Sequence, residues 1–210
     1  MHRADGGGPT GNERLTATTG LLLVVLLAIE ATTPLDLHSF LPVHIFLGLL
    51  LLVPVALKLA SAGWRFARYY LGSTPYRLLG PPQVFLRLLA PLLVVSTVVL
   101  LGSGVAVLAV GHGGGLLLSV HAVSFAVWGG LVAVHTVAYL GRVVTVGTAD
   151  WRRRAQAVSG GSLRRLAVAG ALVAGVVVAL ATLSVQEAWL SARHHHRHHE
   201  HAVATAAPRG

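Results

Sequence analysis

Long apolar runs separated by short polar connections dominate the chain. Crossing the hydrocarbon core of a bilayer takes about 20 apolar residues in a helix, and five runs have that length. They lie at roughly 15–33, 41–61, 88–110, 117–140 and 165–186. A helix satisfies its own backbone hydrogen bonds, which is why it can span lipid. The pattern therefore predicts an all-α membrane protein, a bundle of about five transmembrane helices.

Composition supports a membrane protein and excludes several other classes. Hydrophobic residues make up 54% of the 210 residues and charged residues 11%, against about 25% charged residues in an ordinary soluble domain. Cysteine is absent, so disulfides, cysteine-ligated metals and iron–sulfur clusters are excluded. Ile29 and Glu30 stand where a signal-peptide cleavage site would need small residues. We therefore expect the first run to be a retained helix.

Polar tails flank the apolar runs. Residues 1–14 are rich in glycine and charge, and residues 188–210 are rich in histidine. Such segments are typically disordered, because they offer too little apolar surface for burial. The predicted organisation is a disordered N-terminal tail at 1–14, a transmembrane helical domain at 15–187 and a disordered His-rich tail at 188–210.

Basic residues predict the orientation of the chain. Eleven of the 16 lysines and arginines fall in the segments 58–87 and 142–165, while the connections at 34–40 and 111–116 contain none. Lysine and arginine in short loops are retained on the cytoplasmic side. We therefore expect a protein of the cell membrane with its N-terminus in the cytoplasm and its C-terminus outside. The net charge of +9 then reflects topology and attraction to anionic membrane lipid, and we expect no nucleic-acid partner, since no recognition module fits such short loops.

Two histidines interrupt the fourth apolar run. His121 and His135 are fourteen residues apart, which at about 100° per residue places them on nearly the same face of a helix, about 21 Å apart along its axis. The second run repeats this spacing with His44 and Lys58. The two runs cross in the same direction, so His44 can lie level with His121 and Lys58 level with His135. Because imidazole is a standard ligand of haem iron, this spacing points to a haem between two helices.

The same residues carry a family resemblance. The motifs "VHIFLG", with His44, and "SVHAVSF…AVHTVAY", with His121 and His135, resemble those of small membrane cytochromes b of the b561-like and ferric-reductase-like type. The resemblance covers about 40–140, with the first helix as a further member of the unit. It implies a four-helix unit made by the first four helices, haem b as cofactor, and a role as an oxidoreductase or electron-transfer subunit.

Lys58 departs from the four-histidine pattern of that family. An inner haem would need the neutral amine of Lys58 as a ligand, whereas a lysine near a helix end ordinarily extends its ammonium group to the lipid headgroups. Intramembrane histidines also serve as hydrogen-bond partners between helices, and this alternative stays open for His44, His121 and His135. The sequence thus predicts one haem b, held by His44 and His121, and leaves a second haem open.

Small residues mark two further places. Gly48 lies one turn after the histidine of the second run and Gly129 lies between the two histidines of the fourth. Their missing side chains leave room either for a flat macrocycle or for close helix packing. In the fifth run small residues recur every four positions, at Ala167, Ala171 and Gly175. They predict a packing face, which could meet another helix of the chain or an oligomeric partner.

Two polar segments hold further candidate sites. Segment 64–91 mixes arginines with tyrosines, which is typical of an interfacial anchor; a quinone or small-anion site at Arg65, Arg68 and Tyr69 is the alternative. The C-terminal tail carries a cluster of imidazoles that either binds Zn, Ni or Cu or remains solvated. Its six histidines are His194, His195, His196, His198, His199 and His201.

Two functions therefore remain open at this stage. One is a haem b membrane protein that transfers electrons to or from a redox partner or quinone. The other is a haem-free structural or partner subunit in which the histidines bridge helices. No hydrolase triad, nucleotide-binding glycine loop or zinc-peptidase helix is present in the sequence, so no catalytic residue is assigned.

Overall fold

All secondary structure in the described part of the chain is helical. The computed structural model describes residues 8–78, 84–111, 115–149, 158 and 160–191. Its elements are α1 (Gly8–Glu30), the 3-10 turn η1 (Thr33–Asp36), α2 (Leu37–Tyr70), α3 (Thr74–Arg77), α4 (Val84–Val110), α5 (Gly115–Gly147) and α6 (Gly161–Ala181), and helical residues resume at 183–191. The predicted all-α fold class is confirmed.

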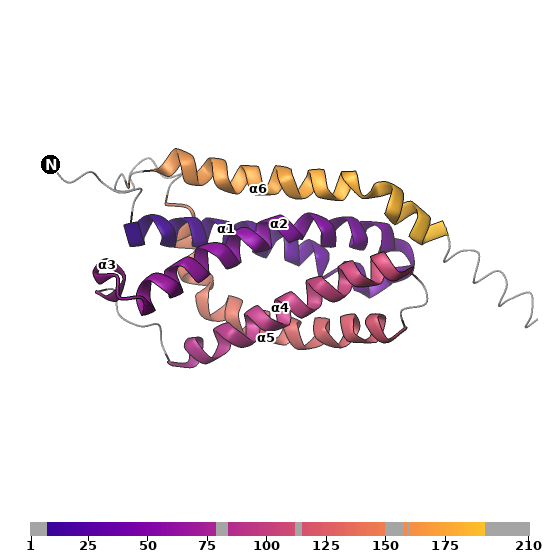
Figure 1. The fold of residues 1–210 in the computed structure, drawn as a ribbon, viewed down its shortest axis with the longest axis horizontal. Coiled ribbons are helices and arrows are strands. Elements are labelled where there is room, and N and C mark those ends of the chain that lie inside the picture. Colours follow the sequence, from indigo (N-terminus) through magenta and orange to yellow (C-terminus); the bar gives the residue numbers. More distant parts are fainter. Residues whose placement is uncertain (1–7, 79–83, 112–114, 150–157, 159, 192–210) are drawn as a thin grey trace, which may run out of the picture.

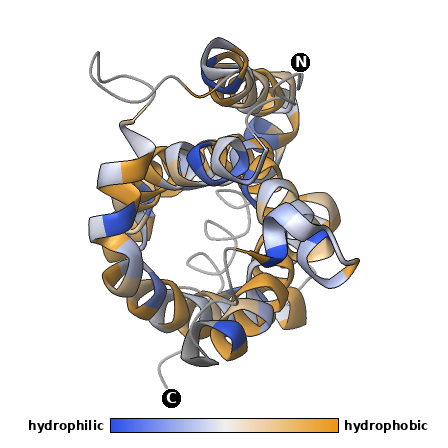
Figure 2. Cartoon of the chain, turned by 90° about the vertical axis from the view of Figure 1, so that its left-hand side faces the viewer, coloured by the Kyte–Doolittle hydropathy of each residue, from blue (hydrophilic) through white to orange (hydrophobic). Residues whose placement is uncertain are grey.

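Length and hydropathy of these helices fit a lipid bilayer. The described residues contain four helical segments long and apolar enough to cross a membrane, at Gly8–Tyr70, Arg87–Val110, Gly115–Gly147 and Gly161–Ala181. The first stretch holds both α1 and α2, which fold back at η1 and pack side by side (Figure 1). Large apolar side chains lie exposed along the bundle, and apolar residues occur along all of its long helices (Figure 2). Such a surface is stable in lipid and not in water, so the chain is a membrane protein.

Helix packing arranges α1, α2, α4 and α5 around a common axis. α1 packs against α2 and α5, and α4 packs against α5 and touches α2. α2 and α5 therefore lie across the bundle from each other, and they run in the same direction (Figure 1). α6 lies outside these four helices, where it packs against α2 and α1.

The predicted small-residue face of α6 is the contact with α2. Ala171, Gly175 and Ala179 are buried, and Ala167 is half-buried at the edge of this face. A Cβ atom at Gly175 would collide with the backbone carbonyl of Leu50. The absence of a side chain thus allows the two backbones to approach closely, and the partner of this face is a helix of the same chain.

One end of the bundle gathers the basic residues, and we call it the basic end. It comprises the start of α1, the ends of α2 and α5, and the starts of α4 and α6; α3 also lies there (Figure 1). The opposite end, which we call the histidine end, contains η1 and the start of α2. The first and last described residues lie at opposite ends of the bundle.

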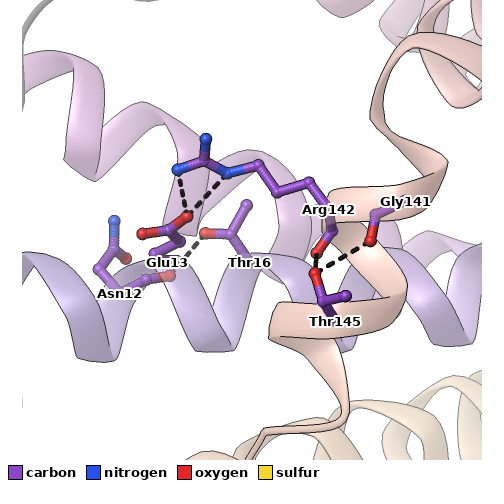
Figure 3. A network of polar contacts seen from close by, with 6 residues as sticks. All are labelled: Asn12, Glu13, Thr16, Gly141, Arg142 and Thr145. Atoms are coloured by element: carbon purple, nitrogen blue, oxygen red, sulfur yellow. Dashed lines mark hydrogen bonds and ion pairs between the residues drawn. The ribbon is translucent and has the colours of Figure 1, made fainter.

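An ion pair at the basic end joins α1 to α5. Arg142 donates from Nε and Nη2 to Oε1 of Glu13, at 2.9 and 2.6 Å (Figure 3). Thr18 of α1 also donates from Oγ1 to the carbonyl of Gly147, at 2.9 Å. Both contacts hold the first half of α1 against the end of α5, and α1 begins at Gly8 and not after residue 14.

The predicted tails therefore differ from the structure at their inner boundaries. Residues 8–14, predicted to be disordered, form the first turns of α1. Residues 188–191, predicted to belong to the C-terminal tail, are helical. The remainder of both predicted tails, 1–7 and 192–210, lies outside the described residues.

Candidate functional site

His44 and His121 meet across the bundle at the histidine end. His44 stands near the start of α2 and His121 near the start of α5. Their ring centroids are 6.2 Å apart, with an angle of 69° between the ring planes. Both residues are half-buried. Because α2 and α5 run in the same direction, residues one to two turns into each helix come to the same level, as the sequence spacing predicted.

The Nδ1 atom of His44 is engaged with the end of α1. It lies 2.6 Å from Oε1 of Glu30 and 2.9 Å from Oγ1 of Thr33. A carboxylate only accepts hydrogen bonds, so Nδ1 carries the proton and donates it to Glu30. In the neutral ring this leaves Nε2 as the unprotonated nitrogen, the one with a lone pair to offer a metal.

The Nδ1 atom of His121 is engaged in the same way with α4. It lies 3.1 Å from the backbone carbonyl of Leu100 and 3.2 Å from Oγ of Ser103. The carbonyl is an acceptor, so Nδ1 is again the protonated nitrogen. Gly104 makes room for this ring, because a Cβ atom there would lie 3.0 Å from Cε1 of His121.

The separation of the two rings is one at which both imidazoles could hold a single metal ion. Two imidazoles bound on opposite sides of one metal, with metal–nitrogen bonds of about 2.0–2.1 Å, have ring centroids about 6 Å apart. The observed separation is 6.2 Å. Metal-bound histidines ordinarily donate their second N–H to a carboxylate or carbonyl, as both rings do. Within the described part of the chain, no residue hydrogen-bonds to Nε2 of either ring.

Two glycines on the helices that carry the histidines have no neighbour where a side chain would begin. No atom lies within 4 Å of the position that a Cβ would take at Gly48 or Gly129. Gly48 is one turn along α2 from His44, and Gly129 is two turns along α5 from His121. Two imidazoles whose Nδ1 atoms are held by protein acceptors are a ligand set of the kind that haem b takes.

The structure does not pair Lys58 with His135 as it pairs the outer histidines. Lys58 turns toward α1, where Nζ donates to the carbonyl of Thr16 at 2.7 Å. Gly20 makes room for this ammonium group, since a Cβ there would lie 2.9 Å from Nζ. His135 packs on the ring of Tyr139, with centroids 4.8 Å apart. Lys58 is near enough to act on His135 electrostatically, but its nitrogen is engaged by α1.

The described residues do not form any of the other predicted metal sites. None of these residues forms a cluster of three or more His, Cys, Asp or Glu side chains that could hold a metal ion. The tail histidines lie outside the described residues: His194, His195, His196, His198, His199 and His201.

The aromatic and basic segment after the transmembrane part of α2 has the character of an anchor. The guanidinium of Arg68 lies 5.6 Å from the ring centre of Trp64 and 5.9 Å from that of Tyr76. Arg77 donates from Nε to the carbonyl of Tyr69 at 3.3 Å. Stacked arginines and exposed aromatics are typical of the headgroup region.

A groove of about 740 Å³ lies elsewhere, between α4 and α5, and is lined mostly by apolar side chains.

Glu30 and Gly104 contact the two histidines, and the sequence pattern did not predict either contact. Glu30 is the sole acidic residue in the five apolar runs, and an ionisable residue in such a run signals a functional contact. The sequence does not show that its partner is His44, because η1 decides how α1 and α2 meet. Gly104 carries no signal of its own, since glycines are common in this chain.

Comparisons with known proteins do not identify a family for this chain. No family model matches the chain, and no curated protein or solved structure matches it.

Proposed function

We propose that the chain is a membrane cytochrome in which His44 and His121 hold one haem b near the histidine end of the bundle. The observation that carries this proposal is the 6.2 Å separation of the two rings, with both Nδ1 atoms engaged by protein acceptors. The resemblance of the same residues to b561-like and ferric-reductase-like cytochromes b supports it. When bound, haem supplies one-electron redox chemistry.

The protein would supply ligation, orientation and an apolar environment. His44 and His121 would bind from α2 and α5, while Glu30 and the carbonyl of Leu100 keep the two rings in the required tautomer. The corresponding role is electron transfer within or across the membrane, as an oxidoreductase or as a subunit that serves a redox partner or quinone.

The proposed orientation places the basic end in the cytoplasm. Arg65 and Arg68 lie near the end of α2, Arg77 ends α3 and Arg142 lies near the end of α5. Short cytoplasmic connections retain such residues. Among the described residues of the two connections at the histidine end, none is lysine or arginine. The haem would then lie near the external face, and anionic lipid headgroups would meet the basic end.

A second candidate function rests on the same hydrogen bonds. His44 links α2 to α1 through Glu30, and His121 links α5 to α4 through Leu100 and Ser103. Such bonds between helices are a sufficient structural reason for a histidine in a membrane protein. In this alternative the chain is a haem-free structural or partner subunit.

The test is a dithionite-reduced minus oxidised absorbance spectrum of detergent-purified protein, expressed with a haem precursor. We expect the bands of a six-coordinate haem b, at one haem per chain. His44→Ala and His121→Ala should each remove these bands, whereas His38→Ala should not, because His38 is exposed at the start of the same helix. A folded, colourless protein that takes up no added haem would exclude the cytochrome and leave the haem-free subunit.

A further inference from the structure

Glu30 differs from every other carboxylate among the described residues, because it is directed at one of the two facing imidazoles. Resting on the proposed haem site, we propose that Glu30 is a positioning residue that fixes the orientation of His44 and lowers the reduction potential of the iron which His44 would ligate. Glu30 is the last residue of α1, and His44 stands on the next helix.

The contact is short and shielded from solvent. Oε1 of Glu30 lies 2.6 Å from Nδ1 of His44, and the Glu30 side chain is 12% exposed. Charge-assisted hydrogen bonds of this length are about twice as strong as neutral ones. The bond therefore holds the imidazole in one orientation.

The carboxyl group of Glu30 meets no donor other than His44 among the described residues. Its Oε2 atom is buried and makes no hydrogen bond with any of them. The hydroxyl of Thr33 donates to the backbone carbonyl of Glu30, at 2.7 Å, and not to the carboxylate. The charge therefore acts mainly on the imidazole of His44, in surroundings where low dielectric strengthens its field.

The two ligands are consequently unequal. His121 meets neutral acceptors, the carbonyl of Leu100 and the hydroxyl of Ser103, whereas His44 meets a carboxylate. A carboxylate on the N–H of a metal-bound histidine raises the basicity of the ligand. Greater basicity and a nearby negative charge both favour ferric over ferrous iron, so the reduction potential falls.

The decisive experiment is a redox titration of the purified, haem-loaded protein at a single pH. Glu30→Gln keeps the length of the side chain and an acceptor for Nδ1–H but removes the charge. We expect it to keep its haem and to show a midpoint potential at least about 59 mV higher, a tenfold change for a one-electron couple. Glu187→Gln is the matched control, because Glu187 is exposed beyond α6 and its replacement removes the same charge.

Each outcome decides the matter. A haem-loaded Glu30→Gln protein with the wild-type potential overturns the inference, and so does an equal shift in Glu187→Gln. Glu30→Asp keeps the charge, so the midpoint potential of this variant should stay within about 59 mV of the wild-type value. A larger shift overturns the inference, even where the glutamine variant does not fold. Absence of haem from the wild-type protein would instead overturn the proposed function itself.

Discussion

The ring of His121 packs against the backbone of α4 at Gly104, where a Cβ atom would lie 3.0 Å from Cε1. α4 thus supports the imidazole in two ways, through this close approach and through the acceptor carbonyl of Leu100. The position of one proposed haem ligand is therefore set by a neighbouring helix as much as by α5, which carries it.

Replacing Gly104 by valine should displace His121. The added side chain would require the ring to move away from α4, and overpacking of this kind costs about 1–3 kcal/mol. We expect a lower haem content per chain and a lower melting temperature, measured by absorbance and by thermal unfolding in detergent. Gly102→Val is the control, because no atom lies within 4 Å of its Cβ position. Equal haem content in the two variants would show that α4 does not support the ring.

Lys58→Met and His135→Ala should each retain the haem. Lys58 donates to the carbonyl of Thr16, and His135 packs on Tyr139, so neither is arranged as an axial ligand. The measurement is haem per chain, by the absorbance of reduced pyridine complexes. Loss of half of the haem in either variant would reveal a second haem at the inner level.

Gly175→Ala should weaken the packing of α6 on α2. A Cβ at this position would collide with the backbone carbonyl of Leu50, which cannot move without shifting α2. We expect a loss of about 1–3 kcal/mol in the free energy of unfolding, measured by chemical denaturation in detergent. Gly170→Ala, at a position with no neighbour within 4 Å, should leave stability unchanged or raise it slightly. A Gly175→Ala protein as stable as the Gly170→Ala protein would contradict the close approach.

The ion pair between Glu13 and Arg142 should contribute little. The side chain of Arg142 is 62% exposed, and exposed pairs contribute about 0.2–1 kcal/mol. A double-mutant cycle with Glu13→Gln and Arg142→Gln should give a coupling free energy in that range. The coupling should vanish at about 1 M salt, where the Debye length is about 3 Å. A coupling that survives this salt concentration would mean that the pair is screened from solvent.

The hydrophobic pattern was a good guide to the helices and a poorer guide to their ends. Each of the five apolar runs falls within or overlaps a helix, because apolar length and internal hydrogen bonding are local properties. The observed helix ends differ from the predicted ones where polar residues of one helix contact another helix. Glu13 illustrates this, since it lies in a segment whose composition is typical of disorder, yet it is part of α1 and contacts Arg142 of α5.

The spacing of the histidines predicted a shared level but not the partners around it. A spacing of fourteen residues places His44 and Lys58 on one face of their helix, and His121 and His135 on one face of theirs, whatever surrounds them. Lys58 shows where spacing fails. It has the same spacing from His44 as His135 has from His121, yet its ammonium group turns to the carbonyl of Thr16, because the gap at Gly20 offers it a place on α1.

The sequence by itself determined that this chain is an all-α membrane protein and which residues can share a helix face, since both follow from helical geometry and from the length of the apolar runs. Only the tertiary structure decided that Glu30 meets His44, that Gly104 supports His121 and that α6 packs on α2 at Gly175. Such contacts depend on the rotation and distance between helices, which close packing at small residues sets and which no single segment of the chain encodes.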